Sequence, residues 1–327
     1  MRADKKILYL LQSSGEKGVL QSEIPEILDL SKSTVSEILH ALESEGKIIR
    51  EKVSTKSFRV WMTENYPNPI PGVLRIGILK STEYFYVILS ALKCGALIRL
   101  FDDPVDLTRA VSQGKVDIAA SPILTQTMMG ILMKTFRIVR IVAKNGSGLA
   151  LRGENGIYGT TEISTMDRNL RKYLSKIGKK RFRITYFNSP ESIVDNLKKG
   201  LIDGVAIWEP YLTILRRQGY RVEYFRDILG DHFCCSICVN NESLRINGEF
   251  IQEFFEEYDT YCKQNSDEYR KVAEVLDFDE DVVRESLKSY SFCLTPDMDE
   301  IIDYIKDSGL EVSRESISKL FKLDSFT

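Results

Sequence analysis

The stretch LIDGVAIWEPYL, from Leu201 to Leu212, reads as a buried strand that stops abruptly at Trp-Glu-Pro-Tyr. Its apolar residues follow one another without alternation, which is typical of a strand that is covered on both faces of a parallel sheet. Proline lacks the amide that a strand needs, so the strand ends at Pro210. Ligands of open α/β sheets bind beyond the carboxyl ends of the strands, and we therefore expect this segment to line a ligand site.

An earlier stretch repeats the same pattern. PVDLTRAVSQGKVDIAASPI covers residues 104–123, and SPESIVDNLKKGLIDGVAIWEP covers residues 189–210. Each has a helix that starts at proline, then a glycine, then an aspartate that enters an apolar strand. Two similar halves predict two lobes that face each other across a cleft, with the aspartates holding loops. The corresponding positions are Gly114 and Gly200, Asp117 and Asp203, and Pro122 and Pro210.

LKKGLIDGVAIWEPYL and AVSQGKVDIAASPI resemble the two signature segments of the type II periplasmic-binding-protein fold, in its nitrate, sulfonate and thiamine-precursor branch. The resemblance spans roughly residues 73–310. It implies an α/β domain whose two lobes close by a hinge on a small molecule. The ligand-binding positions that it implies are Ser81, Thr82, Glu83, Tyr84, Ser121, Ser164, Thr165, Met166, Asn188, Trp208, Glu209 and Tyr211.

These candidate residues mix aromatic rings with hydroxyl groups. Aromatic faces stack on rings, which favours a small flat heterocycle such as a thiamine precursor. Ser164 and Thr165 are expected at a helix N-terminus, where free amides favour a small oxyanion such as a sulfonate. Both ligand classes stay open, with the heterocycle slightly preferred.

The first sixty-five residues have a different pattern. KKILYLLQSSG, LQSEIPEILDL and SKSTVSEILHALESEGKI predict three helices, and KIIREKV and FRVWMT predict two strands. Together they predict a winged helix-turn-helix, and LSKSTVSEILHALESEGKIIR resembles archaeal and bacterial winged-helix regulators. That resemblance implies that the third helix enters the major groove of double-stranded DNA, usually as part of a homodimer.

The residues expected to contact DNA are of two kinds. Small hydroxyls and a lysine at the start of the third helix suit base edges and phosphates, and basic side chains on the wing suit phosphates. The candidates are Ser31, Lys32, Ser33, Thr34, Ser36, Arg50, Lys52, Lys56 and Arg59.

The segment ENYPNPIPG predicts an extended linker between these two architectures. The expected domains are residues 1–65, a linker over 66–72, and a two-lobed domain over 73–327 with its second lobe at about 157–225. A net charge of −2 indicates no strong field toward nucleic acid or membrane. Because the start of the chain is polar and no apolar run approaches a membrane span, we expect a cytoplasmic protein without a membrane partner.

Metal and cofactor chemistry are not expected. The chain has six cysteines and two histidines, and Cys235 and Cys238 would point to opposite faces of a strand. The sequence therefore predicts a one-component transcription regulator, not an enzyme, in which a small ligand changes DNA binding. Two alternatives stay open: an enzyme similar to the thiamine-pyrimidine synthases, with Lys80 and His232 as candidates for its chemistry, and a cytosolic ligand-binding adaptor.

Overall fold

The computed structural model describes residues 2–55, 57–153, 156–264, 266–292 and 294–323. The chain divides into two units, Met1–Pro69 and Ile70–Thr327, and each is described by itself. No helix among the described residues is long and apolar enough to cross a membrane.

The unit Met1–Pro69 packs three helices against an antiparallel sheet with the strand order β1-β3-β2. Leu11, Leu39 and Val60 belong to its apolar core, and Ser31 caps α3 by accepting a hydrogen bond from the Thr34 amide at 3.0 Å. The pairing of β1 with β3 was not predicted. The elements are α1 (Ala3–Ser14), η1 (Gly15–Lys17), β1 (Val19–Leu20), α2 (Ile24–Leu28), α3 (Lys32–Ser44), β2 (Ile48–Ser54), β3 (Ser57–Met62) and η2 (Thr63–Asn65).

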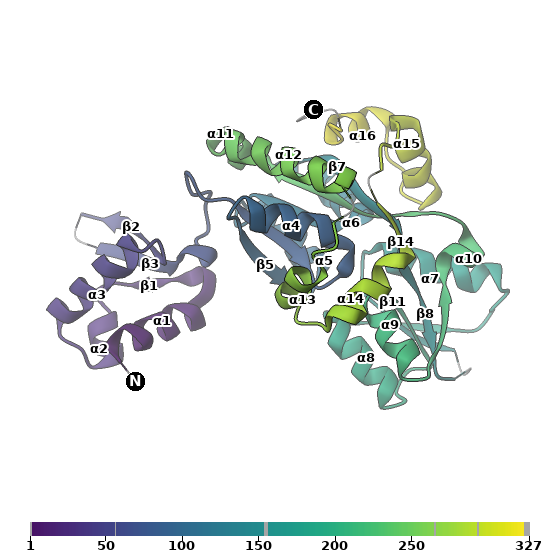
Figure 1. Ribbon diagram of the computed structural model, residues 1–327, viewed down its shortest axis with the longest axis horizontal. Helices are drawn as coiled ribbons and strands as arrows, with labels where there is room; N and C mark the ends of the chain where they lie inside the picture. The colour runs from purple at the N-terminus through teal and green to yellow at the C-terminus, as the bar shows by residue number, and fades with distance from the viewer. Residues whose placement is uncertain (1, 56, 154–155, 265, 293, 324–327) are drawn as a thin grey trace. The chain divides into compact units, whose positions relative to one another are not determined.

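The unit Ile70–Thr327 is a mixed α/β structure with two lobes (Figure 1). The first lobe contains a six-stranded sheet in the order β14-β7-β13-β6-β4-β5. The strands are β4 (Arg75–Leu79), β5 (Leu97–Phe101), β6 (Ile118–Pro122), β7 (Phe136–Asn145), β13 (Phe233–Asn240) and β14 (Tyr290–Phe292); the helical segments are η3 (Thr82–Tyr84), α4 (Phe85–Lys93), α5 (Pro104–Ser112), α6 (Ile123–Met133), α11 (Asn241–Ile246) and α12 (Gly248–Gln264).

The second lobe contains a five-stranded sheet in the order β10-β9-β11-β8-β12. It begins earlier than predicted, because β8 follows β7 directly and pairs with β11 and β12. Its strands are β8 (Ser147–Leu151), β9 (Ile157–Thr160), β10 (Arg183–Tyr186), β11 (Gly204–Trp208) and β12 (Arg221–Tyr224); its helices are α7 (Thr165–Lys176), α8 (Pro190–Lys198), α9 (Tyr211–Arg217) and α10 (Phe225–Leu229).

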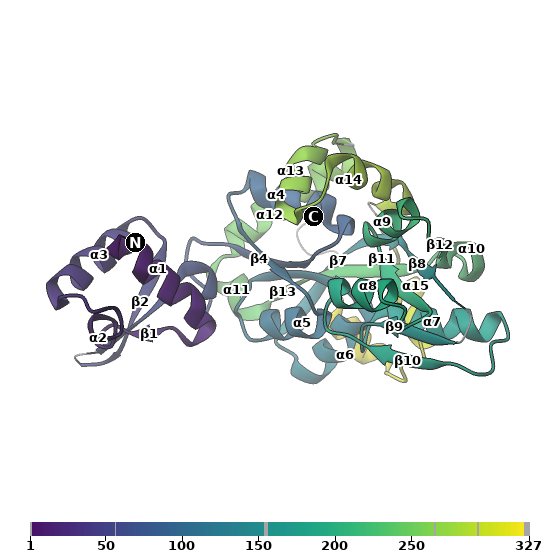
Figure 2. The ribbon, with the colours of Figure 1, turned by 90° about the horizontal axis from the view of Figure 1, so that it is seen from below.

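The remaining helical segments lie in the C-terminal part of the chain. They are α13 (Tyr269–Leu276), α14 (Glu280–Ser286), η4 (Leu287–Ser289), α15 (Met298–Asp307) and α16 (Arg314–Leu320). α13 packs on α4 of the first lobe and α14 packs on α9 of the second, so this segment contacts both lobes (Figure 2).

The internal repeat is present in both lobes. α5 and β6 form one copy and α8 and β11 the other, and each helix starts at its proline. Gly114 and Gly200 follow these helices with φ angles of 74° and 73°, a left-handed conformation that glycine adopts without steric cost. Each copy therefore delivers the end of a buried strand to the cleft.

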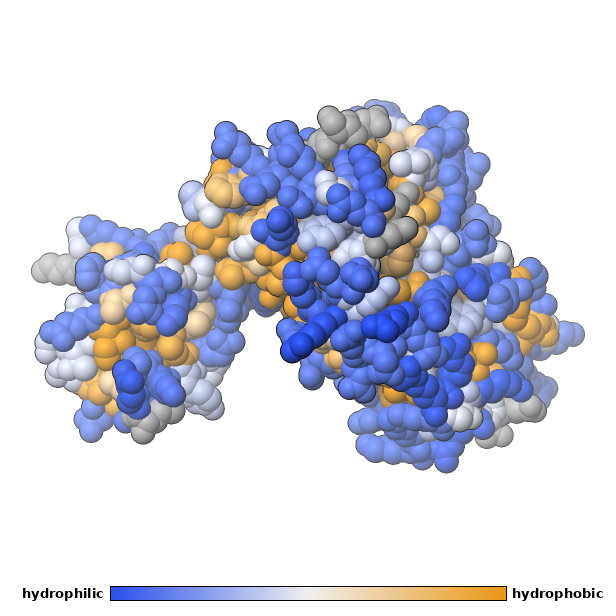
Figure 3. Space-filling model, in the orientation of Figure 1, coloured by the Kyte–Doolittle hydropathy of each residue, from blue (hydrophilic) through white to orange (hydrophobic). Residues whose placement is uncertain are grey.

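The surface is not uniformly polar. Figure 3 shows hydrophobic area over the part of the first lobe that carries α4 and β5. Leu92, Leu97 and Leu100 are exposed there by 41, 37 and 40%.

Candidate functional site

A small cavity lies where strands of both lobes end. β4, β6 and β13 approach it from the first lobe, and β9, α7 and β11 approach it from the second. About 10 Å³ of it is open to the centre of a water-sized sphere, which is room for about one water molecule. The space between the lobes is therefore narrow at this point. The lining residues are Leu79, Ser81, Glu83, Tyr84, Pro122, Thr161, Ser164, Met166, Trp208, Cys234 and Cys235.

Glu83 supplies a carboxyl group on the first-lobe side of the cavity. The loop after β4 turns into η3, where the Ser81 hydroxyl oxygen accepts a hydrogen bond from the Glu83 amide at 3.2 Å. The Glu83 side chain is 1% exposed, and its Oε1 atom has no hydrogen-bond partner among the described residues. Burial raises the pKa of Glu83 to about 7, because the charged form loses its hydration.

Two thiols lie beside this carboxyl group. The Sγ atoms of Cys234 and Cys235 are 3.8 Å apart, and the Tyr84 hydroxyl is 3.1 Å from Cys235 Sγ. Neighbouring residues of a regular strand point to opposite faces. Here the register of β13 against β7 shifts between Phe233 and Cys235, and this β-bulge brings both sulfur atoms to the cavity.

The second-lobe side contributes Thr161, Ser164, Met166 and Trp208. Ser164 caps α7 by accepting a hydrogen bond from the Asp167 amide at 3.2 Å, and its hydroxyl donates to the Thr161 carbonyl at 2.8 Å. The Trp208 indole N–H donates to the Lys80 carbonyl at 3.1 Å. Because Lys80 belongs to the first lobe, this bond joins the two lobes at the edge of the cavity.

Half of the predicted ligand positions are brought together. Ser81, Glu83, Tyr84, Ser164, Met166 and Trp208 line the cavity. The others lie outside its lining, namely Thr82, Ser121, Thr165, Asn188, Glu209 and Tyr211.

Most of the residues outside the lining are engaged elsewhere. Ser286 donates a hydrogen bond to the Thr82 hydroxyl, and Gln126 donates one to the Ser121 hydroxyl. Thr165 donates to the Cys234 carbonyl, Tyr211 donates to Glu191, and Asn188 is exposed.

The Glu209 carboxylate stabilises the fold through hydrogen bonds. Its carboxylate accepts hydrogen bonds from the Thr213 amide at 2.9 Å, the Thr213 hydroxyl at 3.0 Å, the Tyr224 hydroxyl at 2.6 Å and the Ser289 hydroxyl at 3.1 Å. These bonds fasten the end of β11 to α9, β12 and η4.

Five lining residues were not predicted: Leu79, Pro122, Thr161, Cys234 and Cys235. Leu79 and Pro122 are the last residues of β4 and β6, so the rule that placed the cleft at strand ends could have found them. For the thiols, the adjacent pair Cys234-Cys235 was the signal that could have indicated a shared site. The sequence analysis considered the spacing of Cys235 and Cys238 instead.

Some of the residues that were predicted to contact DNA form hydrogen bonds within the protein. The Arg50 side chain donates to Glu43, with Nε 2.9 Å from Oε2, and Arg59 donates to the Lys17 carbonyl at 2.8 Å. Ser31, Lys32, Ser33, Ser36 and Lys52 are exposed and Thr34 is half-buried, while Lys56 lies outside the described residues. Arg50 is thus already paired with a carboxylate where a phosphate contact was expected.

Two segments join the lobes, and they run side by side. Asn145 lies on the first, and its amide donates to the His232 carbonyl on the second at 3.0 Å. His232 Nε2 is 3.1 Å from Ser147 Oγ, and Nδ1 is 3.1 Å from the Gly230 carbonyl. Burial lowers the pKa of His232 to about 4, so the ring is neutral near pH 7.

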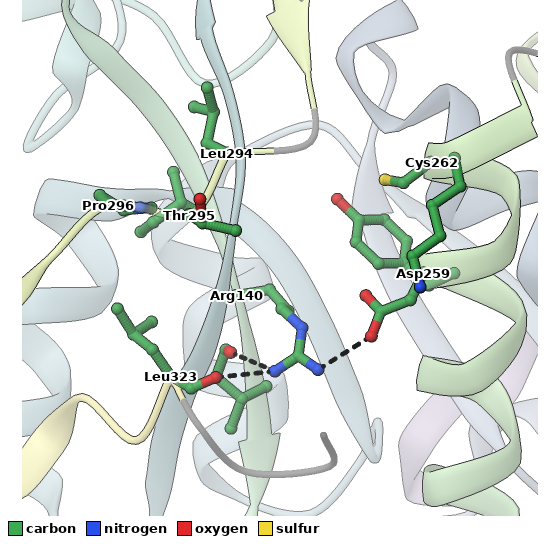
Figure 4. Close-up of a pocket in the computed structure, with 11 residues that line it drawn as sticks. Arg140, Asp259, Cys262, Leu294, Thr295, Pro296 and Leu323 are labelled. Atoms are coloured by element: carbon green, nitrogen blue, oxygen red, sulfur yellow. Dashed lines mark hydrogen bonds and ion pairs between the residues drawn. The ribbon is translucent and has the colours of Figure 1, made fainter.

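A larger cavity of about 420 Å³ lies elsewhere, between β7, α12 and the segment that follows β14. Figure 4 shows Arg140 inside it, with its guanidinium bonded to Asp259 Oδ2 at 3.2 Å and to the Leu323 carbonyl at 2.9 Å. Its lining residues Leu294 and Leu323 adjoin positions 293 and 324–327, which lie outside the described residues.

No protein-family model and no curated protein matches the chain. Among solved structures, the chain is similar to the ligand-binding component of an ABC-type import system from Staphylococcus aureus with zinc bound, with a TM-score of 0.69 and 17% identity over 78% of this chain and 97% of that one. It is also similar to the alkanesulfonate-binding protein SsuA of Xanthomonas axonopodis pv. citri bound to MOPS (TM-score 0.62, 15% identity, 77% of this chain and 99% of that one). A third similar structure is the nitrate-binding protein NrtA of Synechocystis PCC 6803 (TM-score 0.62, 14% identity, 78% and 87%).

These similarities correct the functional prediction. The similar structures are ligand-binding proteins, one of them from an ABC-type import system, and not transcription regulators. The prediction of a ligand-responsive transcription regulator is therefore wrong, and the DNA partner and the homodimer find no support. The expectation of a small-molecule ligand stays a prediction, in line with the alkanesulfonate and nitrate named for two of the similar structures. The chain contains the two-lobed α/β fold of the periplasmic binding proteins.

Proposed function

We propose that Ile70–Thr327 is a solute-binding domain that closes its two lobes on one small molecule. The observation that carries the proposal is the cavity between the lobes, which takes its lining from both of them. About 10 Å³ of the cavity is open to a water-sized sphere, so the lobes lie closer together here than they would around a bound organic molecule. Entry of the solute therefore requires the lobes to separate at the two joining segments around Asn145 and His232.

The lining favours a neutral or cationic solute over an oxyanion. No lysine, arginine or histidine is among the lining residues, so an anion would meet no opposite charge. The unpartnered Oε1 atom of Glu83 accepts hydrogen bonds and suits an N–H group. Tyr84 and Trp208 supply aromatic rings beside it. We propose a small nitrogen heterocycle as the solute class.

We propose that this domain binds its solute without catalysing a reaction. The two candidates for thiamine-pyrimidine chemistry lie outside the lining. His232 faces Ser147 between the lobes, and Lys80 Nζ lies 4.8 Å from the centre of the Phe278 ring and 3.9 Å from Glu191. The cytoplasmic location expected from the sequence stays a prediction, which cell fractionation with an antibody to this chain would check.

For Met1–Pro69 we propose the winged-helix fold, without a function attached to it. Its support is the order of elements, three helices followed by a hairpin whose second strand also pairs with β1. Solution NMR of the full chain would check it, because the β1–β3 pairing predicts close approach of the Val19 and Val60 backbones.

The solute proposal is tested by thermal unfolding of the full chain with a panel of ligands. A solute that binds only the folded state raises the unfolding temperature with its concentration. We expect pyrimidine and thiazole precursors of thiamine to do so and alkanesulfonates and nitrate to have no effect, with the heterocycle effect reduced in Glu83→Gln. Stabilisation by a sulfonate alone would contradict the heterocycle assignment. No stabilisation by any member, with no change of lobe separation in small-angle scattering, would contradict solute binding.

A further inference from the structure

Three potential metal ligands meet in the cavity between the lobes. Among the described residues, Glu83, Cys234 and Cys235 form a group whose carboxylate oxygen and two sulfur atoms all lie within 4.8 Å of one another. All three side chains are buried, with exposures of 1, 2 and 3%. Carboxylate oxygen and thiolate sulfur are both ligands of Zn²⁺ in proteins.

The distance between the two sulfur atoms fits such an ion. Zinc–sulfur bonds of about 2.3 Å at the tetrahedral angle place two sulfur ligands about 3.8 Å apart. Cys234 Sγ and Cys235 Sγ are 3.8 Å apart. The β-bulge in β13 produces this geometry, because a regular strand would direct adjacent cysteines to opposite faces.

Glu83 gives an independent reason to expect a cation. The two thiols and the Cys235 backbone are hydrogen-bond partners of the buried carboxyl group, but its Oε1 atom has no partner among the described residues, and an unsatisfied buried polar atom is costly. No basic residue lines the cavity to supply that partner. A metal ion held with the two thiolates would supply it.

The surroundings also support a metal ion. The Tyr84 hydroxyl lies 3.1 Å from Cys235 Sγ, where it can donate a hydrogen bond to a thiolate ligand from outside the coordination shell. The Thr165 hydroxyl donates to the Cys234 carbonyl at 3.1 Å and fixes the backbone of the pair. With the lobes closed, the free space has the size of an ion or a single water molecule.

We propose that Glu83, Cys234 and Cys235 bind one thiophilic divalent cation of the Zn²⁺ class, with the fourth coordination position open to the solute or to water. Binding replaces the thiol protons, which pass to the solvent, and involves no change of oxidation state. The inference deepens the proposed function, on which it rests, because the three ligands line the same cavity.

The experiment is a Co²⁺ titration of the reduced, chelator-treated full chain. Co²⁺ is a spectroscopic probe for tetrahedral zinc sites, and thiolate ligands give it charge-transfer absorption. We expect one equivalent of Co²⁺ per chain, charge-transfer bands, and displacement of Co²⁺ by Zn²⁺. Cys234→Ser and Cys235→Ser should each weaken binding at least tenfold and reduce the charge-transfer intensity. Glu83→Gln should weaken binding while keeping both thiolate bands.

The matched control is Cys238→Ser. Cys238 lies on the same strand and is 0% exposed, but it does not line the cavity. Its substitution should leave the Co²⁺ spectrum and affinity unchanged. Circular dichroism of each variant shows whether it folds. If a cysteine variant does not fold, Glu83→Gln still tests the proposed site. Absence of charge-transfer bands, or bands of undiminished intensity in both Cys234→Ser and Cys235→Ser, would overturn the proposal.

The two proposals fail in different ways. If a heterocycle stabilises the chain and closes the lobes while Co²⁺ gives no bands, the metal site is wrong and solute binding stands. If Co²⁺ binds through both thiols and no organic molecule has any effect, the metal site stands and the organic solute class is wrong.

Discussion

Asp117 in the first lobe and Asp203 in the second occupy the same place in their lobes. Asp117 directly precedes β6, and its carboxylate accepts a hydrogen bond from the Arg75 amide at 2.8 Å, at the start of the parallel neighbour β4. Asp203 directly precedes β11 and accepts from the Ile157 amide at 2.9 Å, at the start of β9. Each aspartate therefore aligns two parallel strands whose far ends meet at the cavity.

The two aspartates should differ in their effect on stability. Asp117 also forms an ion pair with the buried Arg75 guanidinium, with 3.3 Å between Nε and Oδ2, and accepts from the Ser243 hydroxyl at 2.6 Å. Asp117→Ala would remove the carboxylate from the buried Arg75 guanidinium, at a cost of about 3–5 kcal/mol, whereas Asp203→Ala should cost about 1–3 kcal/mol. Urea unfolding of both variants measures the difference, and an equal or larger cost for Asp203→Ala would contradict this assignment.

Acid should weaken the folded state through His232. Its pKa is about 4 in the folded protein against an ordinary value of 6.5. Because the folded value is the lower one, the contribution is present above pH 6.5 and is lost as the pH falls toward 4. The full difference is about 3 kcal/mol. Arg168 opposes the protonated ring and Asp231 favours it.

The comparison is between the wild type and His232→Gln in metal-free protein, by urea unfolding at several pH values. The wild type should lose more stability than the variant between pH 6.5 and pH 4. Carboxylate titration is common to both proteins and cancels in the difference. Parallel curves for the two proteins would show that His232 is not the group responsible.

Trp208→Phe should loosen the closed form of the lobes. The substitution removes the N–H that donates to the Lys80 carbonyl across the cavity edge. A hydrogen bond of this kind contributes about 0.5–1.5 kcal/mol, so closure and solute affinity should fall about 2- to 10-fold. Small-angle scattering and calorimetric titration measure both effects. Trp61→Phe, in the unit Met1–Pro69, is the control and should leave solute affinity unchanged.

Glu209→Ala should reduce stability more than it reduces solute affinity. The carboxylate accepts hydrogen bonds from Thr213, Tyr224 and Ser289 and lies outside the cavity lining. Leaving several buried donors unsatisfied should cost about 2–4 kcal/mol. Thermal unfolding and ligand titration of the same variant separate the two quantities. A variant of normal stability that binds no solute would place Glu209 in the ligand site instead.

The sequence was sufficient for the two-lobed α/β architecture, because its signals are local. The repeat of a proline-started helix, a glycine and an aspartate before an apolar strand is visible in the letters, and α5–β6 and α8–β11 follow it. The same rule placed Trp208 at the cavity. The rule could not predict that Trp208 lines the cavity while Glu209 does not. The difference depends on the hydrogen-bond donors that β12 and η4 place beside the strand end.

The thiols show a second limit. A regular strand pattern directs Cys234 and Cys235 to opposite faces, and only the shifted pairing of β13 with β7 reverses this. A bulge of this kind depends on the partner strand and is not encoded in the strand itself. The functional prediction failed for a different reason: it extended a resemblance of the first sixty-five residues to the activity of the whole chain.

Tryptophan fluorescence tests the central claim most directly. The chain has two tryptophans, so Trp61→Phe leaves Trp208 as the single reporter at the cavity edge. With folding confirmed by circular dichroism, solute binding between the lobes predicts a saturable change of Trp208 emission with one equivalent of a small heterocycle. Emission that stays constant with every heterocycle, sulfonate and nitrate tested would contradict the binding of a small molecule in this cavity.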